Sequence, residues 1–64
     1  MKYKIEIWQY HSITATFESE DIEEILSWYN YEWKYCCETG GCTFYLYKDG
    51  EELSVDTEIE LGFI

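Results

Sequence analysis

Positive charge is scarce in this 64-residue chain, which has no arginine and only four lysines against fourteen acidic residues. The formal net charge is −10 at pH 7. Phosphates repel such a chain, which argues against nucleic acid as a direct ligand and equally against anionic membrane surfaces. The charge favours a basic protein as the partner.

Long apolar runs are also missing. No segment approaches the ~20 apolar residues of a membrane span. Lys2 and Lys4 are followed by Ile5 and Glu6 rather than by the apolar region of a signal peptide. There is no proline, no repeat and no low-complexity tract. We therefore expect one small domain, residues 1–64, in the cytoplasm of a cell.

Catalytic patterns are absent too. Gly40-Gly41 precedes an expected strand rather than a helix, so this pair does not indicate a phosphate-binding loop. A dyad of His11 with a cysteine would lack an orienting third group. A single-layer domain of this size leaves little room for a cleft, and we expect that the protein is not an enzyme.

Aromatic residues, in contrast, are abundant: three Trp, seven Tyr and three Phe. Acidic chains that lack such residues often stay disordered, but here they supply a core, so the charge must lie outside a folded domain. A domain of this length buries only about 60% of its unfolded surface, and repulsion among acids lowers its stability further. Large aromatic side chains, a metal or self-association would compensate.

The N-terminal half predicts a hairpin followed by a helix. Apolar residues alternate over residues 2–9 and 13–17, which is typical of two paired, half-buried strands. Ser19 is expected to cap a helix whose first turns carry acids, where carboxylates suit the helix dipole. Asn30 is expected to end this helix. Its buried stripe consists of Ile22, Ile25, Leu26 and Tyr29.

The C-terminal half predicts three more strands. They cover residues 31–37, 42–47 and 53–61, with turns at Thr39-Gly40-Gly41 and Asp49-Gly50. The resulting order is ββαβββ, an α+β fold with one mainly antiparallel sheet packed by a single helix.

The acids fall into two groups. One surrounds the expected helix start and the other follows the last turn: Glu18, Glu20, Asp21, Glu23 and Glu24; then Asp49, Glu51, Glu52, Asp56, Glu58 and Glu60. On an extended strand, Asp56, Glu58 and Glu60 would share one face at a spacing of about 6.6–6.8 Å, and such a ladder can occupy pockets that normally hold DNA phosphates. The alternative is a solvated strand face. Solubility needs a charge of only about 2–8, so the whole set favours a basic partner.

Several aromatic residues fit no expected core face: Trp8, Tyr10, Trp28, Tyr45 and Tyr47. Trp and Tyr are the usual anchors of protein interfaces. We therefore interpret Trp8, Trp28, Tyr45 and Tyr47 as candidate partner-binding residues, together with the acids at 20, 23, 24 and 49–60. A more fully covered sheet, or a dimer, would explain them equally well.

Cys36, Cys37 and Cys42 lie within seven residues around a Gly-Gly turn. Zinc binds three or four Cys or His side chains tetrahedrally, so the cluster predicts a structural zinc site. In a strand, Cys36 and Cys37 would point to opposite faces, and a bend would be needed to bring both to one ion. Three reduced thiols, or a disulfide from Cys42 to Cys36 or Cys37, are the alternatives.

The fourth zinc ligand is open at this point. His11 is the only histidine, but the expected topology places it at the opposite end of the sheet from the cysteines. Glu18, Asp21 and Glu38 would lie nearer to them.

In overall character the chain resembles the small acidic inhibitors that phages and prophages of Gram-positive bacteria encode, and it is most similar to type II-A anti-CRISPR proteins. The resemblance rests on the length, the Lys-Tyr-Lys-Ile-Glu-Ile opening, the acids at 18–24 and 49–60 and the α+β plan. It covers character and not a motif, so it assigns no residue. It implies binding to Cas9 that blocks DNA binding or loading, in the cytoplasm of a host cell.

Two other functions stay open. The phage inhibitors of uracil-DNA glycosylase are also small, acidic, sheet-based DNA mimics. A plain interaction adaptor, whose acids only keep it in solution, is the third possibility. In each case the protein would act as a monomer or a small homo-oligomer.

Overall fold

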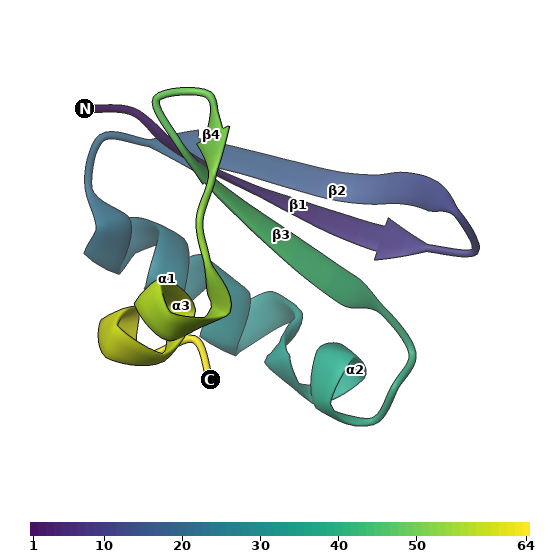
Figure 1. Ribbon diagram of the computed structural model, residues 1–64. Helices are drawn as coiled ribbons and strands as arrows, with labels where there is room; N and C mark the ends of the chain where they lie inside the picture. The colour runs from purple at the N-terminus through teal and green to yellow at the C-terminus, as the bar shows by residue number, and fades with distance from the viewer.

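The computed structural model describes residues 1–64 as four antiparallel strands in one open sheet together with three helices (Figure 1). The elements are β1 (Tyr3–Gln9), β2 (Ser12–Ser19), α1 (Ile22–Glu32), α2 (Lys34–Glu38), β3 (Thr43–Lys48), β4 (Glu51–Glu52) and α3 (Val55–Leu61). The predicted α+β class is confirmed, and the predicted order is roughly consistent with this one. The main differences are that residues 31–37 and most of 53–61 are helical.

The strand β1 lies inside the sheet, whose order is β2-β1-β3-β4. Tyr10 and His11 connect it to β2 with positive φ angles of 51° and 67°, a turn geometry more often built from Asn and Gly. Tyr3 is paired with Ser19 on β2 and with Lys48 on β3. The start of β1 therefore lies between the ends of its two neighbours.

Helix α1 begins at Asp21, whose side chain accepts a hydrogen bond from the Glu23 N–H at 3.0 Å. The predicted cap, Ser19, instead accepts from the Asp21 N–H at 3.1 Å. The helix does not end at Asn30. It continues to Glu32, and Trp33, whose N–H is bonded to the Tyr29 carbonyl, leads into α2.

The predicted strand over residues 31–37 is wrong because its alternation is not a burial pattern. Tyr31 and Tyr35 are 90% and 81% exposed, so nothing packs on the face that they were expected to share with Trp33. Residues spaced by four, Tyr29, Trp33 and Cys37, instead face the core side. Helical periodicity decided the structure of this segment.

The predicted strand over residues 53–61 is corrected as well. The Ser54 side chain accepts from the Thr57 N–H at 3.3 Å and begins α3, and Gly62 ends this helix with a φ of 95°. These are common start and stop residues of a helix. They prevail over the apolar alternation, because Val55 and Ile59 are mostly exposed.

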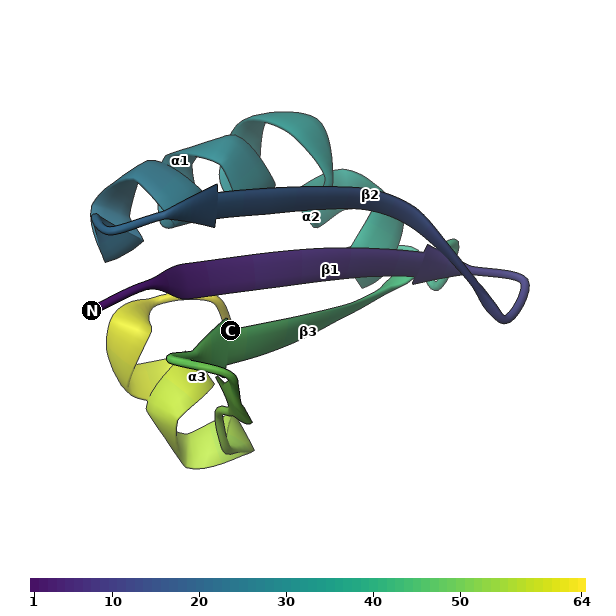
Figure 2. The ribbon, with the colours of Figure 1, turned by 90° about the horizontal axis from the view of Figure 1, so that it is seen from above.

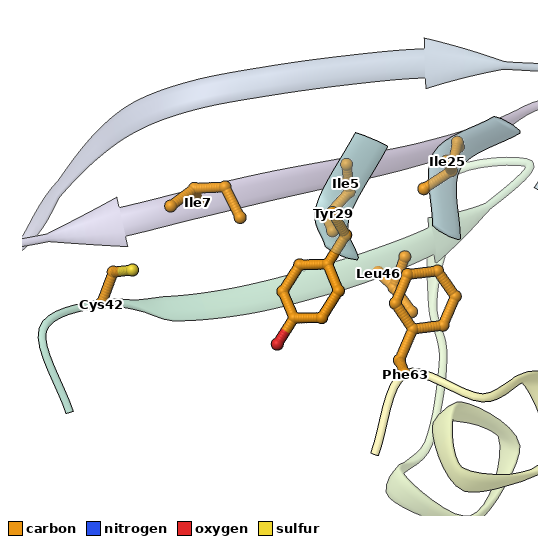
Figure 3. Packing of buried hydrophobic residues seen from close by; sticks show 7 residues of the cluster. All are labelled: Ile5, Ile7, Ile25, Tyr29, Cys42, Leu46 and Phe63. Atoms are coloured by element: carbon orange, nitrogen blue, oxygen red, sulfur yellow. The ribbon is translucent and has the colours of Figure 1, made fainter. Parts of the chain in front are cut away.

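All three helices lie on the same side of the sheet, and the other face is uncovered (Figures 1 and 2). The core fills the space between them, and it consists of Ile5, Ile7, Ile25, Tyr29, Cys42, Leu46 and Phe63 (Figure 3). Phe63 comes from the end of the chain and lies 5.6 Å from the Tyr29 ring centre. The turn at Gly62 is what directs it inward.

We expect Phe63→Ala to lower the free energy of unfolding by about 3 kcal/mol, since it removes a buried aromatic ring and leaves a cavity. Urea unfolding followed by tryptophan fluorescence measures this loss. Ile64→Ala is the matched control, because Ile64 is 66% exposed and its loss should cost less than about 0.5 kcal/mol. Equal effects of the two substitutions would contradict the packing of Phe63.

Candidate functional site

The two acidic groups lie at the same end of the sheet, although they are far apart in the sequence. The β2–α1 and β3–β4 connections flank the start of β1, because both neighbours run antiparallel to it (Figure 1). We call the exposed acids in these connections and beside them the acidic end: Glu18, Glu20, Asp21, Glu23, Glu24, Asp49, Glu51 and Glu52. The opposite end carries the Tyr10–His11 and Gly40–Gly41 turns. Charge is therefore polarised along the strands.

Few of these charges are neutralised. Twelve of the fourteen acids are exposed, and among these twelve only Glu18 and Glu38 have a lysine within ion-pair distance, at 3.6 Å from Lys2 and 4.0 Å from Lys34. Ten exposed carboxylates thus have no ion pair. The lysine that forms none, Lys48, lies 6.0 Å from the Tyr3 ring centre. The acidic end is strongly negative as a result.

The expected carboxylate ladder at residues 56–60 is not formed, because this segment is helical. Asp56 and Glu60 are four residues apart and share an exposed face of α3. Glu58 points away from them and is only 9% exposed. Burial, together with the nearby charge of Glu52, raises its pKa above the ordinary value. Glu58 is thus a buried acid and not part of the negative surface.

The uncovered face of the sheet carries three of the four predicted aromatic residues. Trp8 alternates along β1 with the core residues, and the register sets Tyr45 and Tyr47 on β3 opposite Glu6 and Lys4. The rings of Trp8 and Tyr45 meet edge to face, with their centres 6.1 Å apart. Trp8, Tyr45 and Tyr47 therefore lie on one face, and their role in binding a partner stays a prediction.

Glu6 lies among these aromatic residues, and sequence reasoning did not select it; its place between Lys4 and Trp8 on one strand face was the only signal. Its carboxylate accepts from Trp8 Nε1 at 3.1 Å and from the Tyr47 hydroxyl at 3.3 Å, and Lys4 Nζ lies 3.1 Å away. Burial alone would raise the pKa of Glu6, but these hydrogen bonds and the lysine charge lower it below the ordinary value. Burial and Glu6 in turn raise the pKa of Tyr47.

Trp28 does not join this face. It lies on the helical side of the sheet, where its ring stacks on Phe17 at 5.2 Å and lies 6.4 Å from Trp33. Its contacts hold α1 against β2. Of the predicted aromatic anchors it is the one with a packing role.

The three cysteines gather where α2 meets the start of β3. Cys37 Sγ lies 3.4 Å from Cys42 Sγ. Burial, and then hydrogen bonding with Cys36 and Cys37, raises the pKa of Cys42. A helix turns by about 100° per residue, so consecutive Cys36 and Cys37 both approach Cys42 without the bend that a strand would have needed. Burial and Cys37 also raise the pKa of Tyr29.

The position of His11 corrects the expected topology. Residues 31–37 are helical, so β3 starts beside the end of β1, and His11 lies at the cysteine end of the sheet rather than opposite to it. A hollow of about 340 Å³ is lined by His11, Trp8, Tyr10, Tyr45 and the Gly40–Gly41 turn. Glu18 and Asp21, the alternative ligands, lie at the far end.

No group of three or more His, Cys, Asp or Glu side chains is arranged to hold a metal ion. Zinc bound by Cys36, Cys37, Cys42 and His11 or Glu38 therefore stays a prediction from the sequence. None of the helices combines the length and the apolar character that a membrane crossing requires. No protein-family model, curated protein or solved structure matches the chain, so the site is interpreted from its charge and geometry.

We expect Glu6→Gln to lower the free energy of unfolding by about 1–2 kcal/mol at pH 7, because Lys4 loses its partner and two donors lose a charged acceptor. Since the folded-state pKa is lowered, this contribution is present above the ordinary pKa of 4.5 and is lost as pH falls further. Urea unfolding at pH 7 and at acidic pH measures both effects. The control is Glu18→Gln, because Glu18 is an exposed acid with one ion-pair partner. An equal loss of unfolding free energy in this control would show that the buried contacts of Glu6 contribute nothing special.

We expect the opposite behaviour from Glu58→Gln. The raised pKa means that the ionised carboxylate destabilises the folded protein at neutral pH, so this variant should unfold at a higher urea concentration at pH 7. The advantage should disappear as pH falls below the ordinary pKa of 4.5, where both states are protonated. Glu60→Gln controls for the general loss of one negative charge. An equal gain in stability for Glu60→Gln would contradict the claim that burial of the Glu58 carboxylate destabilises the protein.

Proposed function

We propose that this protein is an inhibitor, encoded by a phage or prophage, that binds a basic nucleic-acid-handling protein of the host. The observation that carries the proposal is the acidic end, where exposed carboxylates from two connections gather with only Lys2 as an ion-pair partner. A groove that holds nucleic acid is lined by Lys and Arg, which release counterions to any dense negative surface. Clustered carboxylates would compete with phosphates for such a groove.

The specific target that we propose is Cas9, in the host cytoplasm, with binding that blocks its access to DNA. Cas9 holds its guide–target duplex in a positively charged channel, which is the kind of surface that the acidic end complements. The resemblance to type II-A anti-CRISPR proteins supports this choice. The proposed DNA mimicry uses the acids of two connections that the sheet brings together, rather than a regular ladder of acids along one strand.

The uncovered face would supply the second part of the binding energy. Trp8, Tyr45 and Tyr47 present rings along this face, from Tyr47 nearest the acidic end to Trp8 at the opposite end. There the hairpin turn adds Tyr10, which is 94% exposed. Charged groups at an interface mainly set the association rate, whereas buried aromatic anchors mainly set the dissociation rate. The two surfaces are therefore separable by experiment.

The first test measures binding to guide-loaded Cas9 and to uracil-DNA glycosylase, at low and high salt. Replacing Glu23, Glu24, Glu51 and Glu52 by Gln should slow association roughly 10-fold at low salt and much less at high salt. A matched pair of variants keeps the change in charge equal: Glu51→Gln with Glu52→Gln, against Glu32→Gln with Glu38→Gln at the other end of the molecule. Equal effects of the two pairs would show that net charge alone matters.

The second test addresses the aromatic residues. Trp8→Ala and Tyr45→Ala should speed dissociation by roughly 10-fold or more and leave the salt dependence unchanged. Binding that ignores salt and competing DNA, but needs these rings, would indicate an interaction adaptor instead of a mimic. Binding to neither enzyme would reject both named targets.

A further inference from the structure

The thiols of Cys37 and Cys42 are in contact, and the proposed function uses neither. Their sulfur atoms are 3.4 Å apart. Cys37 is half-buried at the end of α2, whereas Cys42 is only 8% exposed and belongs to the core. A hollow of about 360 Å³ opens beside both, with Tyr29, Phe44 and Phe63 in its wall. A small molecule can therefore reach this pair from solvent.

We propose that this pair is a site of reversible oxidation, at which a hydroperoxide converts Cys37 and Cys42 to an intramolecular disulfide. The sulfur atoms need to approach by about 1.4 Å to reach the bonding distance. Cys37 can supply this movement, because α2 has five residues, none of them buried, and no side-chain cap. Cys42 is held in place by the core.

The direct 3.4 Å sulfur contact with Cys42 is made by Cys37, and Cys36, which also approaches Cys42, has a further partner. Its sulfur is directed to the amide of Gln9, at 3.7 Å from Nε2. A bond between Cys36 and Cys37 is disfavoured, because consecutive Cα atoms are about 3.8 Å apart and disulfides usually span about 4.4–6.8 Å. The pairing of Cys37 with Cys42 is the one that the geometry favours.

Exposure sets the order of the reaction. The Cys37 thiolate attacks the peroxide, so that an S–O bond forms, the O–O bond breaks and an alcohol or water leaves, which produces a sulfenic acid. The Cys42 sulfur then attacks the Cys37 sulfur, the S–S bond forms, and the S–O bond breaks. The departing hydroxide takes up the Cys42 thiol proton as water. Two thiols lose two electrons, the peroxide gains them, and a dithiol reductant reverses the reaction.

The cross-link would enclose residues 38–41. The Gly40–Gly41 turn within this loop also lines the hollow beside Trp8 and Tyr10, and Gly41 accepts from the Gln9 side chain at 3.4 Å. Oxidation would therefore stiffen one wall of that hollow, and this consequence does not depend on which partner binds there.

The test treats reduced, purified protein with hydrogen peroxide and maps the product by peptide mass spectrometry. We expect a monomeric disulfide between Cys37 and Cys42, with Cys36 still open to alkylation and slower amide exchange at Gly40 and Gly41. Cys37→Ser should abolish the intramolecular cross-link, while Cys36→Ser should leave its rate nearly unchanged. Cys37→Ser carries the test, because Cys42→Ser alters the core.

Four results would overturn the proposal. They are a cross-link that contains Cys36, a dimer joined through cysteines, accumulation of sulfinic acid at Cys37 without a disulfide, or bound zinc that leaves all three thiols unreactive. A failure of binding to Cas9 would leave this chemistry unaffected, so the two proposals fail separately.

Discussion

The structure depends on one constraint: 64 residues supply enough helix to cover only one face of a four-stranded sheet. The covered face takes the apolar side chains, and Ile5, Ile7 and Leu46 become fully inaccessible. The uncovered face must then satisfy its polar groups without help from another layer. It does so through Glu6, whose carboxylate binds Lys4 and receives hydrogen bonds from Trp8 and Tyr47. The aromatic rings that support this network are also the ones left open to a partner.

The same constraint decides where the charge goes. A small core has no room for ionised groups, and Glu58 shows the effect of burying one, since its pKa is raised. Most of the remaining acids lie in or next to two connections, which the antiparallel register brings together beside the start of β1. Mutual repulsion there destabilises the free protein. A basic partner would relieve it, so the feature that weakens the domain alone is the one that favours the complex.

Local patterns in the sequence predict much of the fold, and their failures have a common cause. The first hairpin, the helix with Ile25 and Tyr29 inside, and the Asp49-Gly50 turn follow from alternation, periodicity and turn residues. Residues 31–37 and 53–61 also alternate, but Tyr31, Tyr35, Val55 and Ile59 are mostly exposed, so the alternation does not describe one buried face. Ser54 and Gly62 were the local indications of a helix there. The meeting of the acidic groups and the place of His11 depend on strand order, which no local pattern contains.

The two ends of the molecule differ in chemistry, and this separation is itself informative. The acidic end acts through long-range fields that salt screens, whereas the cysteine end acts through a contact of 3.4 Å between two sulfur atoms that salt does not affect. They are joined by the strands of the sheet and by α1, which begins beside the acidic end and leads into α2. A partner bound at the acidic end would therefore leave the thiols accessible, and oxidation of the thiols would leave the charge unchanged. The uncovered face, which runs from one end to the other, is the one surface that both can influence.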